Sequence, residues 1–287
     1  MEELTRDGDG GLEALARRAA GGERAAAESL VAAVSDDVYN LALRMLGHVA
    51  DAEDAAQEIL MIVLTHLGSF EGRSAFRTWV WRIASRHLLR TRRGRREDMS
   101  FDDIAELLQA GAATTTSPPE PRTAEQQLLV REIEIGCTQG MLLALGREER
   151  VAFILVEILG LSGEETAAVL ELEAPALRKR LSRARVRLGD FMRRHCGLVD
   201  EGNGCRCARQ VPIAVGRGLV NPARLTFAAH ATRDGRSAPL AARVREVDDL
   251  QRAVSLFRDH PDYSAPSQLR DGIRALIHSG RFGVLDA

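Results

Sequence analysis

The sequence predicts an all-α protein with two small helical domains, a flexible linker between them and a mostly helical C-terminal extension. Aromatic residues make up only 4% of the 287 residues and alanine is abundant, which favours helices packed through Ala and Leu over β-sandwiches. Several segments repeat apolar residues at three- and four-residue steps. At roughly 150 residues per domain, the length predicts about two compact units.

The apolar residues and the cysteines indicate a cytoplasmic protein. No window holds 18 uninterrupted apolar residues, and residues 1–30 are acidic and glycine-rich, unlike a secretion signal. Four cysteines in 287 residues are too few for a disulfide scaffold. We therefore expect no membrane insertion.

Charge is segregated along the chain although the net charge is only −2. Residues 73–96 contain nine arginines and no acid, whereas residues 178–194 contain eight basic residues and the single acid Asp190. Residues 1–58 and 97–134 are acidic. Two basic blocks predict two contacts with a polyanion such as DNA. The alternative is that both blocks are solvated helix faces.

The first domain is predicted over residues 23–96, after a flexible segment at residues 1–22. A helix over residues 25–46 ends at Gly47, and a second helix begins with Asp51 as its N-cap. Acidic residues in the first turns of this second helix favour the positive end of the helix dipole and should be exposed.

A loop at residues 68–74 precedes an Arg-rich helix at residues 75–93, which carries both tryptophans of the chain. Aromatic rings interleaved with arginines suit single-stranded nucleic acid, because bases stack on rings while guanidinium groups bind phosphates. We expect Phe76 and Trp79 to lie in the core and Trp81 to be free.

Residues 97–124 are acidic and rich in Pro and Thr, and are predicted to be a linker. The second domain follows at residues 125–195, with helices expected at 125–144 and 147–159. Ser162 and Glu165 fit a capping box at the start of a short helix that ends at Leu170. A basic helix then runs from Pro175 to Arg194, which is the order of a helix-turn-helix.

Two motifs in this order carry a family resemblance. Residues 51–58 (DAEDAAQE) and 76–84 (FRTWVWRIA) look like conserved region two of extracytoplasmic-function (ECF) RNA polymerase sigma factors. Residues 143–188, with SGEETA at 162–167 and LRKRLSRAR at 177–185, resemble region four. The resemblance implies a bacterial factor that binds core polymerase, recognises and melts promoters, and starts transcription at a specific regulon.

The resemblance also assigns roles to residues. The polymerase clamp helices would bind Asp51, Glu53, Asp54, Gln57 and Glu58. The melted minus-ten element would bind Phe70, Arg73, Arg77, Trp81, Arg82, Arg86 and Arg90, with a base leaving the stack. The minus-thirty-five element would bind Ser162, Ala176, Arg178, Lys179, Arg180, Arg183 and Arg187. The expected partners are core RNA polymerase through its clamp helices and flap, promoter DNA and, as a candidate, an anti-sigma factor.

The extension at residues 196–287 is longer than a minimal family member needs. His195, Cys196, Cys205 and Cys207 form a Cys₃His set that could hold a structural zinc ion. A redox pair and unliganded thiols stay open as alternatives, and no cofactor is expected to be required. Further helices are expected at residues 241–257 and 267–279. We expect this extension to regulate activity by masking binding surfaces.

Two other functions are compatible with parts of the sequence. A free-standing helix-turn-helix regulator would bind duplex DNA alone and would not need the acidic residues 51–58. The second alternative is an enzyme that uses Cys and His of the extension. The sequence has no Gly-rich phosphate loop or nucleophile elbow to support catalysis, so we expect no enzymatic activity.

Overall fold

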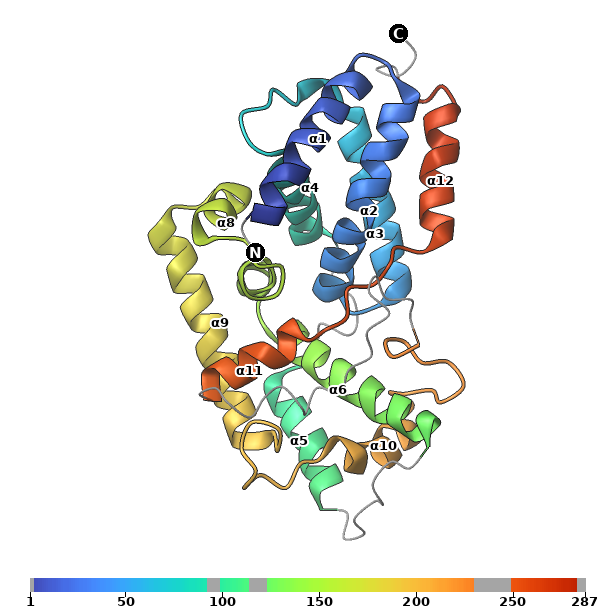
Figure 1. Cartoon of the computed structure of the whole chain (residues 1–287). Coiled ribbons are helices and arrows are strands. Elements are labelled where there is room, and N and C mark those ends of the chain that lie inside the picture. Colours follow the sequence, from blue (N-terminus) through green and yellow to red (C-terminus); the bar gives the residue numbers. More distant parts are fainter. Residues whose placement is uncertain (1–2, 92–98, 114–122, 230–248, 283–287) are drawn as a thin grey trace. The chain divides into compact units, whose positions relative to one another are not determined.

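The computed structural model describes residues 3–91, 99–113, 123–229 and 249–282, and these form two compact units (Figure 1). The first unit contains residues 1–92, 162–174 and 263–287, and the second contains 93–161 and 175–262. All regular elements of the described residues are helical, which confirms the all-α prediction. The units cut across the predicted domain boundaries, because residues 162–174 of the predicted second domain and residues 263–287 of the extension belong to the first unit.

The first unit is a helical bundle built on α2. Its elements are α1 (Glu3–Ala20), α2 (Arg24–Leu46), α3 (Val49–Thr65), the 3₁₀ turn η1 (Leu67–Ser69), α4 (Phe76–Arg90), α8 (Gly163–Leu170) and α12 (Ser267–His278). The apolar stripe of α2 is buried as its spacing predicts, with Leu30, Val38 and Met45 fully inaccessible. Burial of each such side chain contributes roughly 1.5–3 kcal/mol. Gly47 ends α2 in the left-handed conformation, with φ 69°.

The N-terminal segment differs from the expectation of a flexible tail. Residues 3–20 form α1, whose side chains Leu12, Ala16 and Ala19 are buried, and α1 packs on α2. The apolar side chains at positions 12, 16 and 19 follow helical spacing. On sequence alone, the acidic and glycine-rich composition of the segment was given more weight, and this helix was therefore not predicted.

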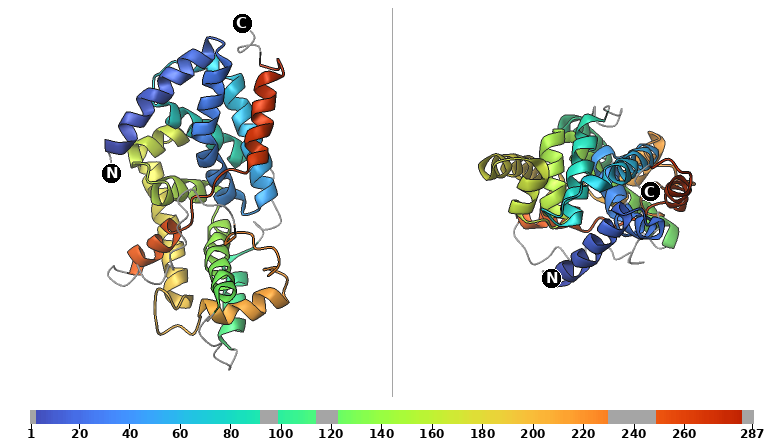
Figure 2. Two further views of the ribbon diagram at one scale, coloured as in Figure 1. Left: turned by 45° about the vertical axis from the view of Figure 1, so that its right-hand side comes forward. Right: turned by 90° about the horizontal axis from the view of Figure 1, so that it is seen from above.

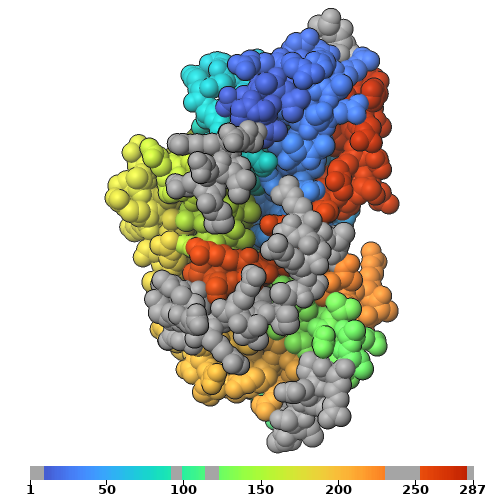
Figure 3. Space-filling view, viewed as in Figure 1, coloured from blue at the N-terminus to red at the C-terminus, as the bar shows by residue number. Residues whose placement is uncertain are grey.

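The end of the extension packs on the first unit. Helix α12 lies alongside α2 and α3 (Figure 2). It buries Leu269, Ile273 and Ile277. On the charged side of α12, two residues contact the Glu28 carboxylate of α2. His278 Nε2 lies 2.7 Å from it and Arg274 Nε lies 3.3 Å from it. In the space-filling view α12 forms part of the outer surface beside α2 (Figure 3).

The second unit contains the remaining helices. They are α5 (Phe101–Ala112), α6 (Ala124–Ala144), α7 (Arg147–Phe153), the π-helical turn η3 (Ile154–Ile158), α9 (Ala174–His195), α10 (Cys207–Gly216) and α11 (Asp249–Arg258). Helix α10 packs on α5 and α6, and α11 packs on η3. Phe257 of α11 meets Phe153 edge-on at 5.3 Å between ring centroids.

Part of the predicted linker is structured. Residues 101–112 form α5, which starts with a capping box in which Ser100 accepts from Asp103 N–H and Asp103 accepts from Ser100 N–H. The Pro- and Thr-rich residues 114–122 lie outside the described residues. Helix α10 was not expected, and the predicted helix at residues 241–257 is described only from Asp249 onward.

Candidate nucleic-acid and partner interfaces

Helix α3 presents an acidic face to solvent. Asp51, Asp54 and Glu58 are exposed, whereas Glu53 and Gln57 are half-buried. The inward side is apolar, with Ala52, Ala55, Ala56 and Ile59 buried. The predicted partner residues therefore share one helix, and Asp51, Asp54 and Glu58 are exposed on it.

The start of α3 differs in detail from the prediction. The N-cap is His48, and Asp51 lies in the first helical turn with its carboxylate 3.4 Å from His48 Nδ1. An acid in this turn still favours the helix dipole. At the other end of the face, Glu58 lies 3.2 Å from His87 Nε2 of α4.

An aromatic cluster lies at the N-terminal end of α4 and includes a residue from the preceding loop. Phe70 packs against Phe76 at 5.3 Å and against Trp79 at 5.5 Å between ring centroids. Phe76 is fully buried, as expected, and Trp79 is half-buried. The cluster packs Phe70, where the loop between η1 and α4 begins, against the Arg-rich helix.

The expectation that Trp81 is free is wrong, because its exposure is only 7%. The buried stripe of α4 is Phe76, Val80, Ala84 and Leu88, and Trp81 follows Val80 in sequence. Helix α8 also packs on α4. Because other helices pack on two sides of α4, the Trp81 ring has little contact with solvent.

Four of the five arginines expected to bind minus-ten DNA contact other residues of the first unit. Arg77 forms an ion pair with Asp37 of α2, and Arg73 lies 2.8 Å from Glu71. Arg82 and Arg86 contact α8 and its C-cap residue. Arg90 is exposed at the end of α4.

Helices α8 and α9 form at the predicted positions. Ser162 caps α8 by accepting from Glu165 N–H at 3.1 Å, and the Glu165 carboxylate accepts from Ser162 N–H at 2.8 Å. Helix α9 starts at Ala174, with Pro175 in its first turn. The capping box prediction is confirmed.

Helix α9 separates an apolar face from a basic one. Leu177, Leu181, Ala184 and Leu188 are buried, at three- and four-residue steps. Of the residues assigned to minus-thirty-five DNA, Ser162 is exposed at the N-cap of α8 and the others surround this stripe on α9. The exposed ones on α9 are Ala176, Arg178, Lys179, Arg183 and Arg187.

These basic side chains differ in how they are paired. Arg180 lies 3.0 Å from Glu148, and Arg183 and Arg187 lie 3.0 and 3.1 Å from Glu149. Both acids belong to α7. Arg178 and Lys179 form no ion pair with the residues that the structure describes, so they are the side chains most available to DNA.

The four cysteines of the chain lie near one another in the second unit. Burial raises the pKa of the Cys207 thiol, and the neighbouring Cys137, Cys196 and Cys205 raise it further. Helix α10 starts at Cys207 and packs on α6, which carries Cys137. The Cys205 sulfur accepts from Gln210 Nε2 at 3.6 Å.

The structure places a different fourth residue near the three cysteines of the predicted metal set. The ring of His195 packs on Phe191 at 4.7 Å between centroids, whereas Cys137 lies with the other three cysteines. Sequence alone did not group Cys137 with the other cysteines. The one signal for it in the sequence is that it is the fourth cysteine of the chain. As placed, no three of the described His, Cys, Asp or Glu side chains are arranged to hold a metal ion.

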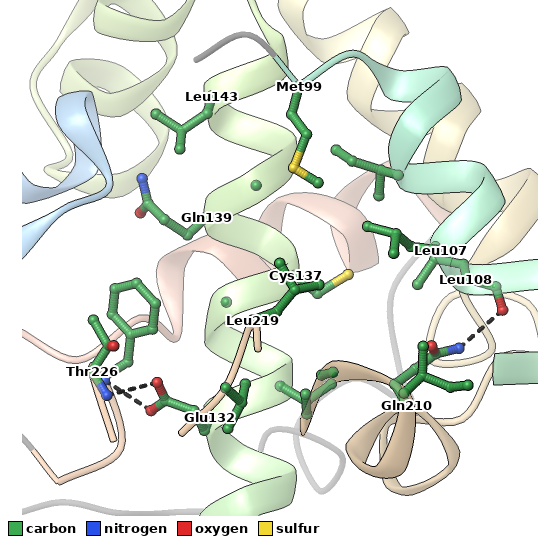
Figure 4. Close-up of a pocket in the computed structure, with 18 of the residues that line it drawn as sticks. Met99, Leu107, Leu108, Glu132, Cys137, Gln139, Leu143, Gln210, Leu219 and Thr226 are labelled. Atoms are coloured by element: carbon green, nitrogen blue, oxygen red, sulfur yellow. Dashed lines mark hydrogen bonds between the residues drawn. The ribbon is translucent and has the colours of Figure 1, made fainter. Parts of the chain in front are cut away.

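An apolar cavity of about 230 Å³ lies between α5, α6 and α10 (Figure 4). Leu108, Cys137 and Leu219 line it. At its edge, the Glu132 carboxylate accepts from the backbone N–H groups of residues 226–228 at 2.7–2.8 Å. This acid therefore anchors the chain that follows α10 rather than facing a ligand.

Two family models match the chain. Sigma-70 region 2 matches residues 30–97, and Sigma-70, region 4 matches residues 135–188. The first match covers α3 and α4, and the second covers α7, α8 and most of α9. The described residues include no helix long and apolar enough to cross a membrane.

Relatives of known class align over most of their length. The chain is 32% identical to RNA polymerase sigma-H factor of Pseudomonas aeruginosa over 63% of the chain and 92% of the relative. It is also 32% identical to ECF RNA polymerase sigma-E factor of Escherichia coli K12, over 60% of the chain and 90% of the relative. Among solved structures, CnrH in complex with the cytosolic domain of CnrY matches with 25% identity and a TM-score of 0.44, over 63% of this chain and 97% of that one. The chain belongs to the sigma-70 family of RNA polymerase sigma factors, in its ECF group.

Proposed function

We propose that the three surfaces divide the work of a sigma factor, which binds core RNA polymerase and directs it to promoters. The acidic face of α3 binds the polymerase clamp helices, the Arg-rich α4 captures the melted minus-ten strand, and α9 reads the minus-thirty-five element. The observation that carries the proposal is the exposed row of Asp51, Asp54 and Glu58 on a helix whose other side is fully packed.

The basic helices support separate DNA contacts. Arg178 and Lys179 reach solvent on α9 and are placed to meet base edges or phosphates. The α4 arginines lie beside the aromatic cluster of Phe70, Phe76 and Trp79, which offers ring surface for an unstacked base. Each phosphate neutralised makes binding weaker at higher salt.

Four further properties belong to this proposal. The protein acts in the cytoplasm and has no enzymatic activity of its own. An anti-sigma factor is a partner, by analogy with CnrH, whose structure contains the cytosolic domain of CnrY. The extension regulates activity, which is supported by its contacts with both units, through α12 in one and α10 and α11 in the other.

Run-off transcription with core polymerase tests the proposal. The template is the chain's own upstream promoter region, and the test variant reverses the charges of Asp51, Glu53 and Asp54. A matched control reverses three exposed acids elsewhere, Asp102, Glu106 and Glu125, so the change in net charge is equal. We expect a specific start with the wild type and the control, and none with the test variant.

The same assay separates the alternative function. A free-standing regulator would bind duplex promoter DNA without polymerase, and the two variants would then behave alike. Truncation after Leu198 tests the regulatory role of the extension, because it removes α10, α11 and α12. Unchanged initiation after truncation contradicts that role.

A further inference from the structure

Helix α8 packs on the side of α4 that faces away from the core. Val80 and Ala84 point into the bundle, and Arg82 and Arg86 follow each of them by two residues, about 200° around the helix. Arg82 Nη2 donates to the carbonyl of Ala168 in α8 at 3.3 Å. The face that α8 contacts is therefore the arginine face proposed to bind minus-ten DNA.

The residue that ends α8 completes this contact. Glu171 accepts from Arg86 through both carboxylate oxygens, with Nε 3.1 Å from Oε2 and Nη2 2.5 Å from Oε1. Guanidinium groups also bind phosphates through contacts with two anionic oxygens. Arg86 and Arg82 lower the pKa of the Glu171 carboxyl, so it is ionised at neutral pH.

Glu171 adopts a backbone conformation that its residue type disfavours. Its φ is 54°, and it is the one non-glycine residue with positive φ among the described residues. Helix ends in this conformation favour glycine. Strain kept at a residue that forms a specific contact points to a function for that contact.

The two helices also bury polar atoms without hydrogen-bond partners. They are Arg82 Nε and Ser85 Oγ on α4 and Thr166 Oγ1 on α8. A buried unpaired donor or acceptor opposes the packing that buries it. The Arg86–Glu171 pair is itself about half exposed, and such pairs contribute little in water. The contact is thus specific but weak, as a reversible contact requires.

We infer that α8 and Glu171 form a latch over the arginine face of α4, with the Glu171 carboxylate in the place of a DNA phosphate, so that minus-ten DNA and α8 compete for this face. The inference rests on the proposed DNA-binding role of α4. Separation of α8 from α4 frees Arg82 and Arg86 for the DNA strand and lets water reach the buried polar atoms.

Equilibrium binding of single-stranded DNA to the full chain tests the latch. The probe is a fluorescein-labelled nontemplate strand of about 12 nucleotides from the chain's own upstream region, followed by anisotropy at about 50 mM salt. The test variant is Glu171→Gln. The control is Glu173→Gln, which removes the same charge from an exposed position in the same turn.

We expect Glu171→Gln to bind the strand about three- to fivefold more tightly than Glu173→Gln, which is the gain from losing a weak competing ion pair. Hydrogen exchange of the α8 amides should also be faster in Glu171→Gln. Equal affinity and equal exchange in the two variants overturn the latch. Glu171→Gly, which relieves the backbone strain, should reproduce the effect without loss of thermal stability.

Run-off transcription distinguishes failure of the latch from failure of the proposed function. If the wild-type holoenzyme initiates and the two variants bind DNA equally, only the latch is wrong. If no variant supports initiation and none binds the strand, the proposed role of α4 fails, and the latch fails with it.

Discussion

The side chain of Asn40 pairs with the backbone of Tyr263 through both of its polar groups. Asn40 Oδ1 accepts from Tyr263 N–H at 2.9 Å, and Nδ2 donates to Tyr263 C=O at 2.7 Å. One turn earlier on α2, Asp36 Oδ1 accepts from Ala265 N–H at 2.7 Å. Two buried polar side chains of region two thus hold the segment that leads into α12.

Asn40→Leu should loosen this attachment. The change keeps the side-chain size but removes both hydrogen bonds between Asn40 and the backbone of Tyr263, which costs about 2 kcal/mol or more. We expect a lower free energy of unfolding for the first unit and faster hydrogen exchange in α12. Thr65→Val, at an exposed position of α3, is the control. Unchanged exchange in α12 would show that the apolar face of α12 alone holds it in place.

Arg150→Met should destabilise the second unit. Arg150 is 2% exposed and donates to the carbonyls of Leu142, Leu143 and Leu145, where α6 ends. The last carbonyls of a helix have no partner within it, so the loss of this cap should cost about 3 kcal/mol. Urea unfolding measures the loss, and Arg193→Met on the exposed side of α9 should change stability by less than about 0.5 kcal/mol.

The sequence predicted local structure better than long-range pairing. Apolar spacing located α2, α3 and α9, and the Ser162 capping box located α8. Helix α5 was missed because acidic, Pro-rich composition outweighed the Ser100–Asp103 capping box. Helix α10 was missed because Pro212 lies inside it.

The contacts that define the candidate sites join distant parts of the chain. Arg86 and Glu171 are 85 residues apart, and Asn40 and Tyr263 are 223 apart. Periodicity describes one helix at a time, so it cannot indicate which helix covers the polar side of α4. For the same reason it assigned Trp81 to solvent, although the packed structure buries this ring.

Arg178→Ala should weaken binding of duplex promoter DNA at all salt concentrations. If Arg178 binds a phosphate, its loss also lowers the slope of log affinity against log salt by about one. The control is Arg194→Ala, an exposed arginine at the end of α9 that donates to Asp190 C=O. If the slope stays constant while selectivity for one base pair relaxes, Arg178 contacts a base edge instead.

Metal-free protein should lose stability as the pH rises above about 8.5. Burial raises the pKa of the thiols of Cys196, Cys205 and Cys207 above that of an unfolded thiol, which is about 8.5. Above that pH the unfolded chain releases protons that the folded chain keeps, so unfolding becomes more favourable, by up to about 1.4 kcal/mol per pH unit for each thiol. Urea unfolding at several pH values measures the slope, and Cys207→Ala should make it shallower. An identical slope in the variant would contradict the assignment.

As placed, the cysteine side chains do not form a metal site, so zinc binding requires them to rearrange. In that case, purified full-length protein should contain one zinc ion per chain, with Cys137 as a ligand in place of His195. Four neighbouring cysteines can supply a closed tetrahedral site, whereas the His195 ring is packed on Phe191. Zinc would stabilise the thiolates that burial disfavours, because metal ligands bind in their deprotonated form. Cys137→Ser and Cys207→Ser should lose the metal, and His195→Gln should keep it. Elemental analysis measures the content, and cobalt substitution reports thiolate ligands by their absorption. Zinc-free wild-type protein, or loss of zinc in His195→Gln alone, would rule out this ligand set, and the thiols would then be packing residues of the contact between α6 and α10.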